Sequence, residues 1–238
     1  MSTPIWVIRV VIFYIGIAIA TVIFGASSPL LFLFSDKIRY FVITRWSHFF
    51  VIWGRRILGL KYRVRGQVPR HKTSMVVISN HQSAWETVFM QTVLPPQSWI
   101  LKKELLYIPF FGWGLALLKP VAIKRQKRGA YQQVISQGTV RLNEGRWVVV
   151  FPEGTRVLPD HHHRFAKGGA GLAIESQHPI LPVAHNAGRF WPRGWWIKKP
   201  GTIQVSIGPL ITPKKGESAQ ALMDRVETWI RDEMQKIG

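Results

Sequence analysis

The sequence predicts an α/β fold: a mixed, largely parallel seven-stranded sheet flanked by helices, preceded by an N-terminal membrane helix or a two-helix membrane hairpin. Two observations indicate this. After Gly59, short β-like runs alternate with helical patterns, and that alternation favours a parallel sheet. Before Gly59, the chain carries a long segment almost free of charge. We therefore divide the 238 residues into membrane-anchoring helices at 1–58 and an α/β domain at 59–238.

The N-terminal segment is long and apolar enough for a bilayer. No side chain from Val10 to Ser35 is charged, and roughly 20 apolar residues cross the hydrocarbon core as a helix. A break is expected between Gly25 and Pro29. A second, more amphipathic helix is expected at 30–58. Whether the first helix spans the membrane or the pair dips into one leaflet stays open.

A cleavable signal peptide is the rival interpretation, because residues 25–28 are small enough for cleavage. The apolar run is long for such a peptide and continues through 30–34, so we expect it to be retained. Basic residues follow the first helix, which favours a cytoplasmic catalytic side at the cell inner membrane. They are Lys37, Arg39, Arg45, Arg55 and Arg56.

Within the α/β domain, short apolar runs mark the strands and longer periodic patterns mark the helices. Strands are predicted at residues 61–65, 75–79, 98–101, 120–124, 147–151, 180–184 and 202–207. Helices are predicted at residues 84–94, 128–143, 168–177 and 218–236. The last helix places its apolar residues on one face, which indicates core packing.

Composition restricts the partners. The formal net charge is +20, with 32 Lys and Arg against 12 Asp and Glu, which implies an anionic partner: nucleic acid, an acidic membrane or a phosphorylated substrate. The 11 tryptophans beside so many cations are typical of a membrane interface. No nucleic acid is expected, because no zinc-finger, RNA-recognition or helix-turn-helix pattern occurs. Without cysteine, neither a disulfide nor a thiolate nucleophile is possible.

A histidine and a carboxylate five positions apart follow the apolar run at 75–79. Ser83 and Glu86 form the pattern of a capping box, so a helix should begin near Ser83. His81 then stays in the preceding loop, where its side chain can meet that of Glu86. This geometry suits a general base held by a carboxylate. The alternative for Glu86 is a purely structural capping role worth about 1 kcal/mol.

A second polar cluster follows the apolar run at 147–151, with the sequence Phe-Pro-Glu-Gly-Thr-Arg at 151–156. Open α/β sheets bind ligands at such strand ends, and arginine is suited to gripping phosphate. The alternative is a local ion pair in which Glu153 and Arg156 close the turn.

Cations also follow two other predicted strands. Lys103 follows 98–101, and Arg125 follows 120–124. They could converge on one anionic group, whereas most surface lysines and arginines are simply solvated. His185, in a buried run, is expected to be a packed, hydrogen-bonded histidine. The tract Asp160 to His163 is not expected to bind metal, because consecutive histidines cannot all point at one ion.

These motifs together resemble one family. Asn80 and His81 with Glu86, the cations at 124–125, the segment at 151–156 and Ile-Leu-Pro-Val at 180–183 stand in the order found in bacterial 1-acyl-sn-glycerol-3-phosphate acyltransferases, in the glycerolipid acyltransferase superfamily. The resemblance covers about residues 58–209. The sequence departs from the family pattern in two places. Glu86 stands where the family usually has Asp, and the block around residues 124–125, which usually carries Gly, Phe and Arg, clearly keeps only Arg125.

The resemblance implies acyl transfer from a thioester to the 2-hydroxyl of lysophosphatidic acid, making phosphatidic acid in phospholipid biosynthesis. It implies His81 as catalytic base, Glu86 as its orienter, and no cofactor beyond acyl-CoA or acyl carrier protein as co-substrate. The residues expected to bind substrate are Arg125, Glu153, Gly154, Thr155, Arg156 and Lys103. The alternatives are another lyso-lipid acceptor, such as lyso-ornithine lipid, or a non-catalytic basic protein that binds membranes.

Overall fold

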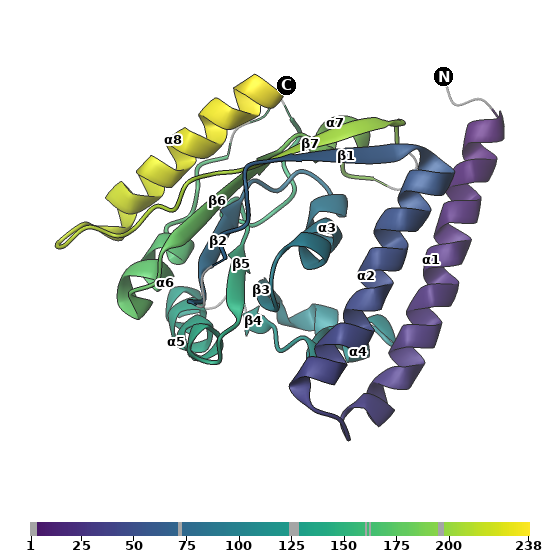
Figure 1. Ribbon diagram of the computed structural model, residues 1–238, viewed down its shortest axis with the longest axis horizontal. Coiled ribbons are helices and arrows are strands. Elements are labelled where there is room, and N and C mark those ends of the chain that lie inside the picture. Colours follow the sequence, from purple (N-terminus) through teal and green to yellow (C-terminus); the bar gives the residue numbers. More distant parts are fainter. Residues whose placement is uncertain (1–3, 71–72, 124–128, 160, 162, 195–197) are drawn as a thin grey trace.

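The structure is a computed structural model that describes residues 4–70, 73–123, 129–159, 161, 163–194 and 198–238. Two long helices open the chain and lie side by side, α1 (Pro4–Leu31) and α2 (Asp36–Leu58) (Figure 1). The end of α2 at Gly59, which takes the left-handed conformation (φ 65°), turns the chain directly into the first strand.

The sheet has seven strands in the order β1-β7-β6-β2-β5-β3-β4. Every neighbouring pair is parallel except β6 and β7, which run antiparallel. The predicted mixed, largely parallel seven-stranded sheet is confirmed. The strands are β1 (Leu60–Arg65), β2 (Val76–Ser79), β3 (Gln97–Lys102), β4 (Val121–Ile123), β5 (Trp147–Val150), β6 (Ile180–His185) and β7 (Gly201–Ile207).

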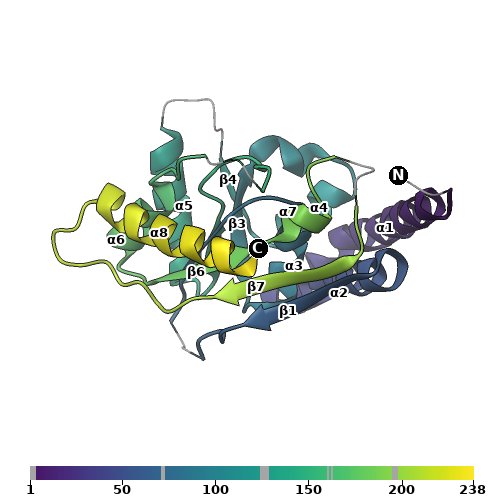
Figure 2. The same ribbon diagram turned by 90° about the horizontal axis from the view of Figure 1, so that it is seen from above.

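Helices cover both faces of the sheet (Figures 1 and 2). The helices that follow α1 and α2 are α3 (Trp85–Val93), α4 (Phe111–Leu117), α5 (Ala130–Asn143), α6 (Gly168–Ser176), α7 (Ala187–Phe190) and α8 (Ala219–Ile237), with a 3-10 turn at η1 (Lys103–Tyr107). The two short helices α4 and α7 and the turn η1 were not predicted, whereas each predicted helix of the α/β domain is present.

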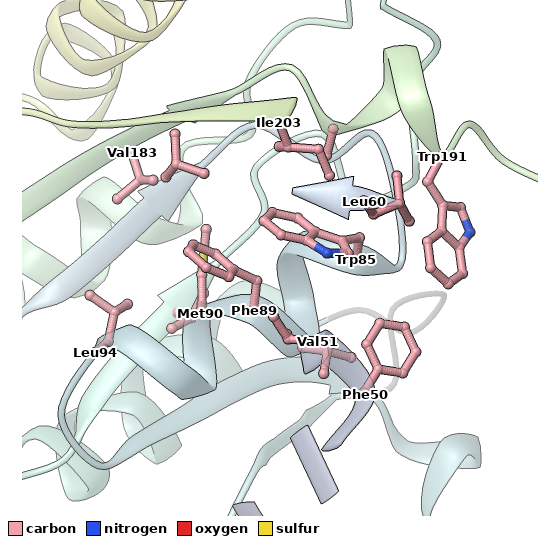
Figure 3. Packing of buried hydrophobic residues seen from close by; sticks show 14 of the residues in the cluster. Phe50, Val51, Leu60, Trp85, Phe89, Met90, Leu94, Val183, Trp191 and Ile203 are labelled. Carbon is pink, nitrogen blue, oxygen red and sulfur yellow. The ribbon is translucent and has the colours of Figure 1, made fainter. Parts of the chain in front are cut away.

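Two apolar cores form because successive side chains of a strand point to opposite faces. Val77 and Val149 belong to the core under α1, α2 and α3, whereas Val76 and Val148 belong to the core under α5, α6 and α8. On the first face Trp85 packs among aliphatic and aromatic side chains (Figure 3). This packing fixes the start of α3, the helix that carries the candidate carboxylate.

The expected helix break between Gly25 and Pro29 is wrong. The helix α1 runs on to Leu31, and α2 begins at Asp36 rather than near Leu30. Small residues serve close packing instead of a turn: a Cβ on Gly25 would lie 2.5 Å from the Phe110 carbonyl oxygen, and Ser28 is fully buried. Pro29 lies in the last turn of α1.

Helix α1 is long and apolar enough to cross a membrane by length and composition, with 28 residues and a mean hydropathy of 2.6 in its most apolar window. Much of its surface is exposed apolar side chain, including Ile8, Ile15 and Ile23. Its Phe13, however, is fully buried in the core that also contains sheet residues. The division into 1–58 and 59–238 stays a prediction.

Candidate active site

The His81 and Glu86 side chains meet at the carboxyl end of β2. His81 lies in the loop after the strand, Glu86 lies in the first turn of α3, and His81 Nδ1 is 2.8 Å from Glu86 Oε1. The side chain of His81 is 18 % exposed, whereas that of Glu86 is 1 % exposed. The histidine thus reaches the surface of the site while its carboxylate partner stays inside.

Both the ring and the backbone of His81 are held by neighbouring residues. Its ring stacks on that of Phe151, with centroids 4.4 Å apart, and its backbone carbonyl accepts from the Val157 N–H at 2.8 Å. A carboxylate at Nδ1 selects the tautomer that carries its proton there. The lone pair of Nε2 then remains for substrate, because no described residue hydrogen-bonds to that nitrogen.

Glu86 orients the histidine and caps the helix at once. Its Oε1 accepts hydrogen bonds from the backbone N–H groups of Gln82 (3.1 Å) and Ser83 (2.9 Å) as well as from His81. The reciprocal half of the predicted capping box differs, since Ser83 Oγ accepts from the Trp85 N–H. The hydrogen bonds are those that both interpretations of Glu86 require, and its catalytic role stays a prediction.

The charge state of Glu86 follows from these contacts. Burial raises the pKa of its carboxyl, but the neighbouring His185, the hydrogen bond from His81 and the amide of Ser83 together outweigh burial and hold the pKa below its usual value. A buried carboxylate is thus kept ionised beside the candidate base, as a histidine that becomes charged during a reaction requires.

His185 is a packed, hydrogen-bonded histidine, as its buried run indicated. Its Nε2 lies 2.8 Å from the Asn80 carbonyl oxygen and its Nδ1 accepts from the Ala187 N–H at 3.2 Å. Asn80 in turn exchanges two hydrogen bonds with the backbone of His185. Burial lowers the pKa of His185, while the charge of Glu86 acts in the opposite direction. The residue ties β6 to the loop that carries His81.

Glu153 follows β5 and touches the same loop. Its Oε1 accepts from the backbone N–H of His81 at 3.2 Å, and its Oε2 is buried with no hydrogen-bond partner among the described residues. Burial raises the pKa of the Glu153 carboxyl to about 8, despite the hydrogen bonds from its own backbone and from His81. The raised pKa favours the neutral acid over the carboxylate at this buried position.

Within the described chain, the structure does not contain the ion pair between Glu153 and Arg156 that was the alternative interpretation of the 151–156 segment. The charge of Arg156 lowers the pKa of Lys198. Gly154 and Thr155 are exposed. The Gly154 N–H donates to the Phe151 carbonyl at 3.1 Å.

The other predicted substrate residues are not all placed. Arg125 lies outside the described residues. Lys103 begins η1 directly after β3. In the sheet, β5 lies between β3 and β2, the strand that precedes His81. No described contact joins Lys103 to His81 or Arg156. Asp160 and His162 of the histidine tract also lie outside the described residues, and the described ones contain no cluster of possible metal ligands.

The sequence did not reveal an apolar cavity that lies among the two N-terminal helices, α3 and α4. Helices α1, α2, α3 and α4 together with β3 line it, and α3 contributes Thr87 and Val88 directly after Glu86. A hydrogen bond between Ser47 and Gln91 borders it. Its walls come from segments far apart in the chain, so only the folded structure brings them together.

Comparison with known proteins agrees with this geometry. The acyltransferase family model matches residues 61–186. A 1-acyl-sn-glycerol-3-phosphate acyltransferase of Pseudomonas aeruginosa is 42 % identical, covering 100 % of this chain and 94 % of that protein. The enzyme of the same name from Saccharomyces cerevisiae is 33 % identical over 74 % of this chain and 62 % of its own length.

The chain belongs to the acyltransferase family. The resemblance inferred from the sequence motifs is confirmed, and the protein is an acyltransferase enzyme. The crystal structure of the 1-acyl-sn-glycerophosphate acyltransferase PlsC from Thermotoga maritima shares the fold, with a TM-score of 0.80 at 26 % identity over 96 % of this chain and 94 % of that one. In this acyltransferase the matched region contains β2, the His81–Glu86 pair and the 151–156 segment.

Proposed function

We propose that this acyltransferase transfers a fatty acyl group from an acyl thioester to the sn-2 hydroxyl of 1-acyl-sn-glycerol-3-phosphate, making phosphatidic acid. The observation that carries the proposal is the hydrogen bond between His81 Nδ1 and the buried Glu86 carboxylate. It leaves Nε2 as a base at the surface of the site, while Arg156 supplies a positive charge nearby. The names of the relatives from Pseudomonas and yeast support the same acceptor.

The chemistry needs no covalent enzyme intermediate. His81 Nε2 takes the proton of the 2-hydroxyl as that oxygen attacks the thioester carbonyl. The tetrahedral intermediate then expels the thiolate, the new ester remains on the lipid, and the imidazolium returns its proton to the thiolate. Acid–base help of this kind is worth about 10²–10⁴-fold, and holding the alcohol beside the thioester adds to it. No cofactor is required.

Glu86 acts on His81 rather than on substrate. It fixes the tautomer and stabilises the imidazolium that forms during attack, as the aspartate of a serine-protease triad does. This positioning role takes place in a buried setting, where an ion pair is worth more than at a surface.

Arg156 is the first choice for the acceptor phosphate, because among the described residues it forms no hydrogen bond or ion pair and a guanidinium binds phosphate through two parallel hydrogen bonds. The neutral acid of Glu153, with its Oε2 left over, is suited to the glycerol region. Gly154 and Thr155 shape the turn between them. Arg125 and Lys103 remain proposed contacts for the same anionic head group.

The acyl chains and the membrane complete the proposal. The apolar cavity beside α3 is suited to a hydrocarbon chain entering from the bilayer. Helix α1 holds the site at the surface of the cell inner membrane, and the basic residues of α2 favour a cytoplasmic catalytic side. The positive surface attracts an acidic donor, acyl-CoA or acyl carrier protein.

The test is an acylation assay of the purified full chain in detergent or lipid. The donor is acyl-CoA or acyl-loaded carrier protein, and the acceptor is lysophosphatidic acid, lysophosphatidylcholine or lyso-ornithine lipid. The assay measures the new lipid and the free thiol, which acyl transfer produces in equal amounts. We expect phosphatidic acid as the main product. A higher kcat/KM with lyso-ornithine lipid or lysophosphatidylcholine would replace the acceptor, and thiol release without a new lipid would refute acyl transfer to a lyso-lipid.

A further inference from the structure

A second cation, Lys198, is buried where the charge of Arg156 acts on its ammonium group. Its residue is 3 % exposed, and its Nζ lies 4.7 Å from the ring centroid of Trp191 and 5.1 Å from that of Tyr14. The ammonium also donates to the Gly194 carbonyl at 3.3 Å. Lysines are rarely this buried, because water must be stripped from the charge.

The aromatic floor beneath Lys198 is itself held rigidly. Trp191 stacks on Phe50 of α2, with centroids 5.4 Å apart, and meets the edge of Phe13 of α1 at 5.3 Å. Tyr14 follows Phe13 on α1. The ammonium is therefore placed by both N-terminal helices and by the segment after α7, rather than by a flexible surface chain.

The electrostatics of this spot favour an anion. Burial first, and then the positive charge of Arg156, lower the pKa of Lys198 to about 8. The positive charge of Arg156 makes the charged form of Lys198 less favourable, so the two side chains are close enough to repel each other. Aromatic faces offset a part of such a cost, about 0.5–2 kcal/mol per contact.

We propose that Arg156 and Lys198, above the rings of Tyr14 and Trp191, form a subsite for the phosphomonoester dianion of the acceptor. The proposal rests on the proposed function and adds the residues that distinguish head groups. A phosphomonoester carries two negative charges near neutral pH and satisfies both cations. A phosphodiester with a choline group carries one negative charge and brings a further cation, which these residues repel.

The subsite makes α1 a part of head-group recognition. Tyr14 lies on the helix that is also the candidate membrane span, so the lipid phosphate is read where the anchor meets the catalytic domain. The alternative is that Lys198 only packs against aromatic rings through its alkyl stem. That alternative predicts no dependence of acceptor binding on the charge of Lys198.

Three variants separate these possibilities. Lys198→Met keeps the apolar packing and removes the charge, Lys198→Arg restores a charge that stays protonated, and Lys199→Gln removes an adjacent but exposed charge as the matched control. We expect Lys198→Met to raise the KM for lysophosphatidic acid about tenfold, in line with the loss of one charge-assisted hydrogen bond, and to change the KM for lysophosphatidylcholine less than about twofold. Lys198→Arg should restore most of the loss, and Lys199→Gln should change neither KM.

Acceptor binding without donor gives a second readout that needs no turnover. Calorimetry at pH 8 in buffers of different ionisation enthalpy should show proton uptake when lysophosphatidic acid binds to the wild-type chain, because the bound dianion favours the charged lysine. Lys198→Arg should bind without that uptake. Tyr14 and Arg156 are the other titratable or charged groups identified beside Lys198. Tyr14→Phe keeps the ring and removes the phenol, and it should retain the proton uptake if Lys198 is the group that takes up the proton.

The outcomes for this subsite and for the proposed function differ. A wild-type chain that forms no phosphatidic acid refutes the proposed function, and the calorimetry still decides the subsite. Normal transfer with an unchanged acceptor KM in Lys198→Met, or equal proton uptake in the wild-type chain and Lys198→Arg, overturns the subsite while the proposed function stands. Equal KM increases for both lysophospholipids would also overturn it, because they would indicate a packing defect.

Discussion

Replacing Glu86 by glutamine separates its two roles. The carboxylate Oε1 accepts from His81 Nδ1 and from the backbone amides of Gln82 and Ser83. A glutamine oxygen can keep all three hydrogen bonds, so capping survives, whereas the negative charge beside the imidazolium is lost. We therefore expect Glu86→Gln to lower kcat strongly and to change the melting temperature little.

The magnitude follows from the distance. Two unit charges about 4 Å apart interact with roughly 4 kcal/mol at an effective dielectric constant near 20, and a neutral hydrogen bond recovers about 1 kcal/mol of it. A net loss of about 3 kcal/mol at the transition state corresponds to about a 10²-fold lower kcat. Two changes in folding stability offset each other. Removing a buried charge stabilises the fold, whereas placing an amide N–H where Oε2 has no described hydrogen-bond partner destabilises it.

The assay is initial rate of phosphatidic acid formation, with thermal unfolding of the same preparations. Glu86→Ala is the contrasting variant: it leaves the donors around it without an acceptor, which costs about 2–5 kcal/mol and lowers the melting temperature by roughly 5–15 °C. Glu86→Asp keeps the charge on a shorter arm and should be more active than Glu86→Gln. Near wild-type kcat in Glu86→Gln would refute the positioning role, and a large fall in melting temperature with normal specific activity would reduce Glu86 to a cap.

Three further predictions concern other parts of the chain. His81→Ala should abolish transfer while circular dichroism and membrane association stay unchanged, and retained turnover would rule out His81 as the base. Because the folded-state pKa of Glu153 is raised to about 8, its stabilising effect is present at low pH and lost as pH rises through that value. Glu153→Gln should therefore match the wild-type melting temperature near pH 4.5 and exceed it at pH 9; a constant difference would contradict the buried neutral acid. Gly25→Val should destabilise the chain by about 1–3 kcal/mol, since its side chain meets the backbone of Phe110, and an unchanged melting temperature would show that α1 and α4 do not pack so closely.

The buried strands and the proximity of His81 and Glu86 were predictable because short stretches of neighbouring residues indicate them. Runs such as residues 75–79 and 147–151 are apolar and β-branched, and the structure places β2 and β5 there with boundaries within a residue. The Ser83 and Glu86 spacing likewise identified the start of α3, although the serine hydroxyl bonds to a different amide than the pattern implies. Local propensity and tertiary packing agree at these places.

Other features depend on contacts between distant segments. Gly25 and Ser28 have the composition of a turn, yet in α1 they provide the small surface against which Phe110 packs. Helix α4 has two glycines in seven residues and carries no helix signal, so burial of its leucines decides its conformation. The pKa of Glu153 and the burial of Lys198 depend on neighbours from three or more elements, and nothing in the flanking sequence indicates them.

The position of β1 has a consequence for how the chain is made. Among the described strands β1 pairs only with β7, and Leu60 lies opposite Gly201. During synthesis α1, α2 and β1 therefore emerge long before the strand that completes their edge of the sheet, and contacts so distant in sequence form slowly. The edge of β1 that pairs with β7 stays open until Gly201–Ile207 has left the ribosome. Premature termination before Gly201 should consequently affect the first strand as severely as the last.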